Sequence, residues 1–284
     1  MSSSGRAPSP RGGARVDART RGLGLSSIQE INQLPRETME RLYARLVPEE
    51  LFTRFAIDPQ SLNGPEGTQL VRVTAPPDKP WARVEVRSST EDRDPALLVD
   101  VEMSGSSVPS LAFVQITNPR SGRYGIDRDL EGRDTLFGTL SRNVDEEVRA
   151  HGDGLAPGQV RRGLKLLPRV LETMDGFCRS IGSDLYLIEP LFYHSAILYE
   201  RQGCGYLLGR EVMEAIHDGF APDGGLTASL DGSSPFRVPE AAHTVRGRSW
   251  ALHDGLASGT WGGVKMYRVV GRPSAIDTFP GGIY

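Results

Sequence analysis

Four short apolar runs between Thr68 and Pro119 restrict the fold of this chain more than any other feature of its sequence. The runs are LVRVTAP, WARVEVRSS, ALLVDVEMS and LAFVQITNP, and turn-forming Pro, Gly, Ser and Asp residues separate them. Runs of this length that are rich in Val, Leu and Phe are typical of β-strands, and short connections between them are typical of hairpins. We therefore predict four strands joined by hairpins in this part of the chain.

The segment 154–210 changes to a helical period. Apolar residues recur at steps of three and four from Val160 to Ile181, which predicts an amphipathic helix that packs on a sheet. Pro168 either kinks this helix or marks the start of its regular part. The runs DLYLIEP, LFYHSAILYERQ (closed by Gly203) and CGYLLG then predict a strand, a second helix and a strand. This order predicts parallel crossovers on a mainly antiparallel sheet, which is an α+β (mixed α/β) fold with flanking helices.

The two ends of the chain differ in composition. Residues 1–24 are mostly Ser, Gly, Pro and Arg, which predicts a disordered tail before a single domain over 25–284. The domain begins with a helical stretch that Pro35 and Pro48 are expected to break into short helices. It ends in a region rich in Gly and Pro with one late strand, Val264–Gly271.

The net charge, the length of the apolar runs and the spacing of the histidines argue against nucleic-acid, membrane and metal binding. A net charge of −3 gives no reason to expect a nucleic-acid partner, which usually calls for a basic domain. No run approaches the roughly 18 apolar residues of a membrane helix, so no membrane partner is expected. The histidines show neither HExxH nor a paired spacing, so we expect no metal site.

The chain has two cysteines, Cys178 and Cys204, and both lie in apolar surroundings. Two cysteines cannot form a disulfide framework, and a reduced cytoplasmic protein is the natural interpretation. We expect each thiol to be a small core group rather than a nucleophile.

Two motifs in the second half of the chain carry a family resemblance. The run Tyr199-Glu200-Arg201-Gln202-Gly203-Cys204 resembles the helix-ending pattern Tyr-Glu-x-x-Gly-Phe of the acyl-CoA N-acyltransferases (GNAT fold). The run LAPGQVRRGLKLL (155–167) resembles the loop Arg-Gly-x-Gly-x-Gly/Ala, with which that family holds the cofactor pyrophosphate. Together with the order of elements over residues 111–210, these motifs resemble a divergent bacterial member of the superfamily.

The resemblance implies acetyl-CoA or a longer acyl-CoA as the acyl donor. A helix N-terminus offers free N–H groups and partial positive charge to a pyrophosphate. The residues that would form this cradle are Gly158, Arg161, Arg162, Gly163 and Lys165. A splayed strand would pair through its backbone with the pantetheine arm, at Phe113, Val114, Gln115 and Ile116. The alternative is that the basic residues only flank a solvent-exposed helix start.

Amine acylation needs an acid for the leaving thiolate and a base for the attacking amine. By resemblance Tyr199 would be the acid, although it would also suit a hydrophobic core. Glu189 follows a central strand and could be the base, with a capping or salt-bridging carboxylate as the alternative. Tyr193 and His194 begin the next helix and would line the acceptor pocket, or His194 would be structural.

The connection 117–153 is expected to be a lid or an insertion after the fourth strand. Its part Asp127–Asp153 holds eight acidic residues and four arginines. An acidic lid, with Asp127 and Asp129 at the substrate, favours a small cationic amine as acceptor. Such a long connection would cover the acceptor site or fill the cofactor groove.

Three departures from the family pattern leave a second hypothesis open. Lys165 stands where a second glycine is usual, Phe192 where many members carry asparagine, and Cys204 where they carry phenylalanine. With the long connection 117–153, these changes favour a catalytically silent module that binds a ligand or a partner. The oligomeric state is not fixed by the sequence, and a homodimer is left open.

Overall fold

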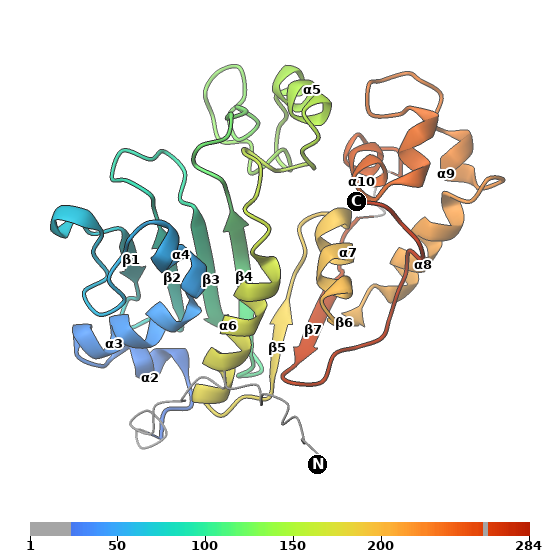
Figure 1. The fold of residues 1–284 in the computed structure, drawn as a ribbon. Coiled ribbons are helices and arrows are strands. Elements are labelled where there is room, and N and C mark those ends of the chain that lie inside the picture. The colour runs from blue at the N-terminus through green and yellow to red at the C-terminus, as the bar shows by residue number, and fades with distance from the viewer. Residues whose placement is uncertain (1–23, 258–260) are drawn as a thin grey trace, which may run out of the picture.

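The computed structural model describes residues 24–257 and 261–284, and Figure 1 shows their arrangement. Over these residues the chain forms a seven-stranded sheet with the order β1-β2-β3-β4-β5-β7-β6. Only β4 and β5 run parallel, and every other neighbouring pair is antiparallel. The prediction of a mixed α+β fold with a mainly antiparallel sheet and flanking helices is confirmed. The predicted tail over 1–24 lies, apart from Gly24, outside the described residues.

The four apolar runs form the first four strands, each antiparallel to the next. Their bounds are β1 Val71–Thr74, β2 Trp81–Val86, β3 Leu97–Met103 and β4 Pro109–Ile116. Burial alternates along β2, where Ala82, Val84 and Val86 are fully buried. This alternation places one face of the sheet in the core.

Short helices at the start of the domain cover one face of these strands (Figure 1). They are α2 Ile28–Asn32, α3 Arg36–Tyr43, the 3-10 turn η1 Ala44–Leu46 and α4 Glu49–Arg54. Pro35 and Pro48 stand immediately before α3 and α4, as the sequence predicted, because proline ends one helix and tolerates the start of the next. Asn32 fixes this layer to the β1–β2 hairpin by donating hydrogen bonds to three backbone carbonyls.

The helix expected from Val160 begins later, as α6 over Leu167–Ser180. Pro168 lies in its first turn, so of the two alternatives it marks the start of the regular part. The preceding residues form a loop, and Val160 packs into a small second cluster with Tyr124 and Ala150 instead of the main core. The helical spacing of Val160 with the later residues was therefore coincidental.

The rest of the sheet comes from strands that are not in chain order. β5 spans Leu185–Ile188, α7 spans Tyr193–Arg201, β6 spans Gly205–Leu208 and β7 spans Lys265–Val269. β7 lies between β5 and β6, so the predicted late strand is an interior strand. The chain therefore leaves the sheet after β6 and returns to fill a gap in it.

Between β6 and β7 the chain forms helices that the sequence analysis did not predict. They are α8 Arg210–Gly219, α9 Gly225–Ala228, the 3-10 turn η3 Pro239–His243 and α10 Val245–His253. α10 packs against α7. After β7 the C-terminal segment returns to α10, whose first residue Val245 donates a 2.8 Å hydrogen bond from its N–H to the carbonyl of Ile283.

The long connection 117–153 forms a separate lobe beyond the end of β4 (Figure 1). Its one helix, α5, spans Val144–Gly152. Arg123 anchors the lobe through ion pairs with Asp94 (2.9 Å) and Asp127 (2.7 Å). Tyr124, Ile126 and Ala150 of the lobe form a small apolar cluster with Leu155 and Val160 of the loop before α6.

No helix of the described residues is long and apolar enough to cross a membrane. Cys178 and Cys204 are both buried and free, and burial raises the pKa of each thiol to about 12. Both thiols therefore stay protonated at neutral pH, as expected of small core groups.

Candidate functional site

The parallel pair β4–β5 separates after two residue pairs. Ser110 pairs with Leu187 and Leu111 with Ile188, after which the ladder ends. β4 continues to Ile116, and its residues from Ala112 onward change from buried to half-buried. The edge of β4 that faces away from β3 therefore has free backbone N–H and C=O groups over these residues.

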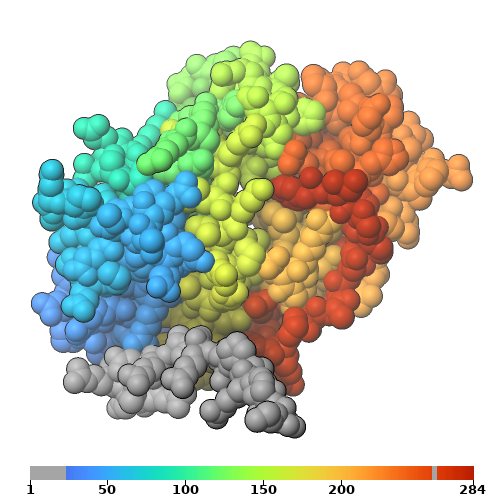
Figure 2. Space-filling view, viewed as in Figure 1, coloured from blue at the N-terminus to red at the C-terminus, as the bar shows by residue number. Residues whose placement is uncertain are grey.

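A cavity of about 750 Å³ lies where the two strands separate. Its wall comes from β4, the loop before α6, the β5–α7 turn and α7, with Arg246 of α10 and Tyr284 completing it. Figure 2 shows the surface hollowed between the yellow-green residues before α6 and the dark-red C-terminal segment. The volume falls within the range of small-molecule sites, roughly 300–1,000 Å³.

Most residues selected from the sequence line this one cavity. They are Phe113, Val114, Gln115, Ile116, Gly158, Arg161, Arg162, Gly163, Lys165, Glu189, His194 and Tyr199. Segments that are 80 residues apart in the chain therefore meet at one place. Tyr193, Asp127 and Asp129 do not line it.

The loop before α6 fits closely between β4 and the turn after β5. A Cβ atom at Gly163 would lie 3.2 Å from the carbonyl oxygen of Ile116, so the loop backbone touches the free end of β4. A Cβ at Gly158, whose φ is +77°, would overlap the ring of Phe192. Lys165 adopts a φ of +59°, the left-handed conformation in which glycine is usual.

The basic residues of this loop have different partners. Arg161 forms a 2.7 Å ion pair with Asp94 and donates to the carbonyl of Pro119, so its charge is already used to hold the lobe. Arg162 is exposed and donates to the carbonyl of Asp153 (2.9 Å). Lys165 is exposed and forms no ion pair within the described part of the chain. Arg162 and Lys165 therefore leave positive charge at this side of the cavity.

These two charges stand beside the N-terminus of α6. The helix begins after Leu166, whose side chain makes no capping hydrogen bond to it. The N–H groups of Leu167 and Arg169 lack partners within the helix, whereas Pro168 between them has no N–H, and the helix dipole adds partial positive charge there. The arrangement can bind an anionic group.

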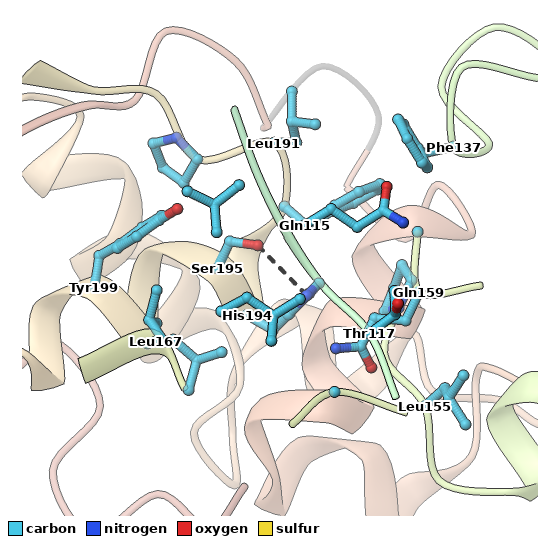
Figure 3. Close-up of a pocket in the computed structure, with 18 of the residues that line it drawn as sticks. Gln115, Thr117, Phe137, Leu155, Gln159, Leu167, Leu191, His194, Ser195 and Tyr199 are labelled. Atoms are coloured by element: carbon cyan, nitrogen blue, oxygen red, sulfur yellow. Dashed lines mark hydrogen bonds between the residues drawn. The ribbon is translucent and has the colours of Figure 1, made fainter. Parts of the chain in front are cut away.

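Tyr199 reaches the cavity from the last turns of α7. Its side chain is half-buried, and burial raises the pKa of its phenol. The hydroxyl therefore stays protonated at neutral pH and can donate a proton or a hydrogen bond. Figure 3 shows it directed toward the other lining side chains.

Glu189 lies at the edge of the cavity, and its side chain is 60% exposed. One carboxylate oxygen is 2.9 Å from Nζ of Lys265 on β7. This contact matches the salt-bridging alternative for Glu189. It also leaves the carboxylate next to the opening between β4 and β5.

His194 is buried in the first turn of α7, behind the surface of the cavity. Its Nδ1 lies 2.9 Å from Ser249 Oγ on α10, and its Nε2 lies 3.4 Å from Ser195 Oγ (Figure 3). Burial, together with the nearby Arg246, lowers the pKa of the imidazole to about 3. The ring is neutral at physiological pH and links α7 to α10.

The remaining candidates lie elsewhere. Tyr193 is buried with its ring edge-on to Trp261. Asp127 pairs with Arg123, and Asp129 accepts hydrogen bonds from the backbone N–H and the Nε of Arg133. The two aspartates are therefore neutralised inside the lobe and do not give the cavity an acidic rim.

Arg246, Tyr284 and Phe137 are among the lining residues that the sequence analysis did not select. Arg246 and Tyr284 come from the region after Ile216, where the pattern predicted only loops and one strand. Phe137 belongs to the lobe, and its ring stacks on Phe113 with the centroids 5.5 Å apart. Only tertiary packing brings these residues to β4, so no local pattern could have indicated them.

The described residues contain no group of three or more His, Cys, Asp and Glu side chains arranged to hold a metal ion. The assembled site is thus a cavity with a free strand edge, an uncapped helix N-terminus and a protonated phenol. Comparison with known proteins finds no family model, no curated protein and no solved structure that matches this chain.

Proposed function

We propose that this chain is an acyltransferase of the GNAT fold that transfers an acyl group from acyl-CoA to a small amine. The observation that carries the proposal is the opening between β4 and β5, with the N-terminus of α6 on one side and Tyr199 on the other. The resemblance in the sequence implies such a splayed strand beside a phosphate loop. The seven-strand order, with one parallel pair at β4–β5, supports it.

The residues present fit an acyl-CoA donor. The pyrophosphate would lie at the N-terminus of α6, where Arg162 and Lys165 add charge. The pantetheine arm would pair with the free backbone edge of β4 over 112–116, much as an added strand would. The close contact of Gly163 with Ile116 joins these two subsites into one continuous surface.

In the reaction the amine nitrogen bonds to the thioester carbonyl carbon, and the bond from that carbon to sulfur breaks. The proton lost by the amine goes to Glu189, the carboxylate at the solvent edge of the cavity. The thiolate takes its proton from the hydroxyl of Tyr199, which burial keeps protonated. Lys265 holds Glu189 at the cavity edge through its 2.9 Å contact.

The acceptor is a small amine, but Asp127 and Asp129 do not support a preference for extra positive charge. Both lie outside the cavity and are paired with arginines. Acceptor selection must come from other residues of the wall.

Thermal unfolding with and without millimolar CoA tests the donor site. A ligand that binds only the folded chain raises the melting temperature, and about 100 times its dissociation constant stabilises by roughly 2.7 kcal/mol. Adenosine alone, which lacks the pyrophosphate and the pantetheine arm, is the matched control. Equal melting temperatures with CoA and without ligand would refute the donor site.

A second candidate is a ligand-binding module without catalysis. The ion pair between Glu189 and Lys265 favours it, because a paired carboxylate is a poor base. This module would be stabilised by CoA but would release no free thiol from acyl-CoA with any amine. Thiol release that depends on both substrates would exclude it.

A further inference from the structure

Arg246 enters the cavity from α10, in the helical insertion between β6 and β7. It is half-buried, and its Nε is buried with no hydrogen-bond partner among the described residues. Its guanidinium carbon lies 5.2 Å from the ring centroid of Tyr284, which also lines the cavity. The ring supports one face of the guanidinium and leaves its N–H groups in the plane available.

The charge of Arg246 is not neutralised by the described part of the chain. No carboxylate of those residues lies within ion-pair distance of it. Other partly buried arginines nearby do have such partners: Arg142 and Arg237 pair with Asp254, and Arg161 pairs with Asp94. Arg248 is also buried without a carboxylate partner among the described residues, but it lies outside the cavity, and Arg162 and Lys165 are exposed. Arg246 is thus a partly buried cation of the cavity wall without such a partner among the described residues. An anion on the ligand would relieve this cost.

The surroundings of Arg246 show that this charge acts inside the cavity wall. Burial is the main cause of the lowered pKa of His194 and of His151, and the positive charge of Arg246 lowers both further. Its Nη1 lies 3.2 Å from the place of a Cβ atom on Gly154, whose φ is +78°. The guanidinium thus reaches from α10 to the loop that precedes α6, and a side chain at Gly154 would displace it.

The cavity therefore has two separate cationic places. One is the N-terminus of α6 with Arg162 and Lys165, and the other is Arg246, which comes from a different part of the chain. The donor phosphates are accounted for at the first place under the proposed function. The second place has a planar guanidinium, the group best suited to a carboxylate in bidentate geometry.

We propose that Arg246, supported by Tyr284, binds the carboxylate of the acyl acceptor, and that the acceptor is an α-amino acid. This inference rests on the proposed acyl transfer and assigns its acceptor class. An α-amino acid carries its amine one carbon away from the carboxylate. Binding of that carboxylate by Arg246 fixes where the nitrogen lies in the cavity, which orients it for attack.

The experiment compares wild type with Arg246→Gln, and uses Arg210→Gln as the matched control. Arg210 is an exposed arginine of α8 outside the cavity, paired with Glu214. Each protein is assayed with acetyl-CoA or octanoyl-CoA and a panel of proteinogenic α-amino acids, each paired with its carboxamide. Melting temperatures with CoA and with each amino acid are measured in parallel.

We expect wild type and Arg210→Gln to use the best amino acid with at least a tenfold lower KM than its amide. In Arg246→Gln the ratio of the KM of the amide to that of the amino acid should fall to about one, because only the amino acid has a carboxylate for Arg246 to bind. The CoA-induced rise in melting temperature should stay unchanged in this variant. The amino-acid-induced rise should disappear in Arg246→Gln alone.

Three other results would each refute a different part of the proposal. If Arg246→Gln loses the CoA-induced rise and keeps the preference for the acid over the amide, Arg246 binds a donor phosphate and the acceptor role is refuted. If wild type shows no preference for acids over amides despite normal CoA binding, the acceptor class is refuted and the donor site stands. Absence of any CoA effect on wild type would refute the proposed function, and the acceptor role with it.

Discussion

The Nε2 atom of His253 on α10 lies 3.0 Å from a carboxylate oxygen of Glu147 on α5. Both side chains are almost fully buried, and this contact joins the lobe after β4 to the insertion between β6 and β7. The His253 ring also lies edge-on to Phe192, which lines the cavity. The two insertions therefore support each other behind the same cavity wall.

We expect Glu147→Gln to destabilise the protein by about 3 kcal/mol at pH 7, because His253 and Arg142 would lose a buried charged partner. Burial raises the pKa of Glu147, but the bonds from His253 and Arg142 outweigh it and hold that pKa below its usual 4.5. A folded pKa below the unfolded one means that the carboxylate stabilises the fold above pH 4.5 and ceases to do so as the pH falls further. Urea unfolding at pH 7 and at pH 4 and below measures both effects.

The difference between wild type and Glu147→Gln should shrink as the pH is lowered. Glu211→Gln, at an exposed position in the first turn of α8, is the control and should match wild type at each pH. A difference that is independent of pH would mean that the charge on Glu147 is not what holds the two insertions together.

His194 predicts a second pH effect in a different window. Burial lowers the pKa of its imidazole from 6.5 to about 3 in the folded chain. Below pH 6.5 the His194 imidazole is therefore protonated in the unfolded chain but stays neutral in the folded chain. The free energy of unfolding consequently decreases as the pH falls from 6.5 toward 3. The loss approaches about 1.4 kcal/mol per pH unit from this group. Melting temperatures between pH 7 and pH 5 should fall less steeply in His194→Asn than in wild type, whereas exposed His243→Asn should keep the wild-type slope.

Replacement of Lys165 by glycine should separate the effect of its backbone conformation on stability from the effect of its charge on CoA binding. Because Lys165 has a φ of +59°, Lys165→Gly removes backbone strain and should stabilise the free protein by about 1 kcal/mol. The same change removes a charge beside the N-terminus of α6 and should weaken CoA binding severalfold. Chemical denaturation and calorimetric titration with CoA test the two effects. The corresponding change at Lys79, an exposed lysine with no positive φ, should cost roughly 0.5–1 kcal/mol of stability and leave CoA binding unchanged.

Tyr199→Phe should lower the rate of acyl transfer by roughly a hundredfold, in line with loss of a general acid. Melting of the variant with CoA should show the same ligand-induced rise as wild type, because the hydroxyl is not part of the phosphate subsite. Tyr267→Phe, on β7 and outside the cavity, is the matched control. A Tyr199→Phe enzyme with the wild-type rate would remove this residue from the acid role.

The sequence predicted those parts of the fold in which local pattern and tertiary packing agree. The strands β1 to β4 show alternating or fully apolar runs bounded by turn residues, and they form where predicted. The start of α6 was placed too early because Val160 keeps the helical spacing, although it packs beneath the lobe. The backbone of Lys165, whose φ is positive, cannot continue a helix there.

The residues of the candidate site also fall into two groups, those that a local sequence pattern indicates and those that only tertiary packing brings to the cavity. Its β4 edge, its loop and Tyr199 lie in elements with clear patterns, and they could be selected from the sequence. Arg246 could not, because α10 has buried residues around most of its circumference and shows no single apolar stripe. Asp127 and Asp129 were assigned by charge alone, and charge does not indicate which arginine folds back onto each carboxylate.

The position of β7 between β5 and β6 means that the sheet cannot be completed until a late stage of synthesis. During synthesis β5 and β6 leave the ribosome well before residues 265–269, so each presents an unpaired edge until the last strand arrives. Open edges of this kind attract other chains, and pairings between distant segments form slowly. The helical insertion between β6 and β7 lengthens this interval. Chains that stop before residue 265 should therefore aggregate, whereas in the completed chain β7 pairs with both β5 and β6.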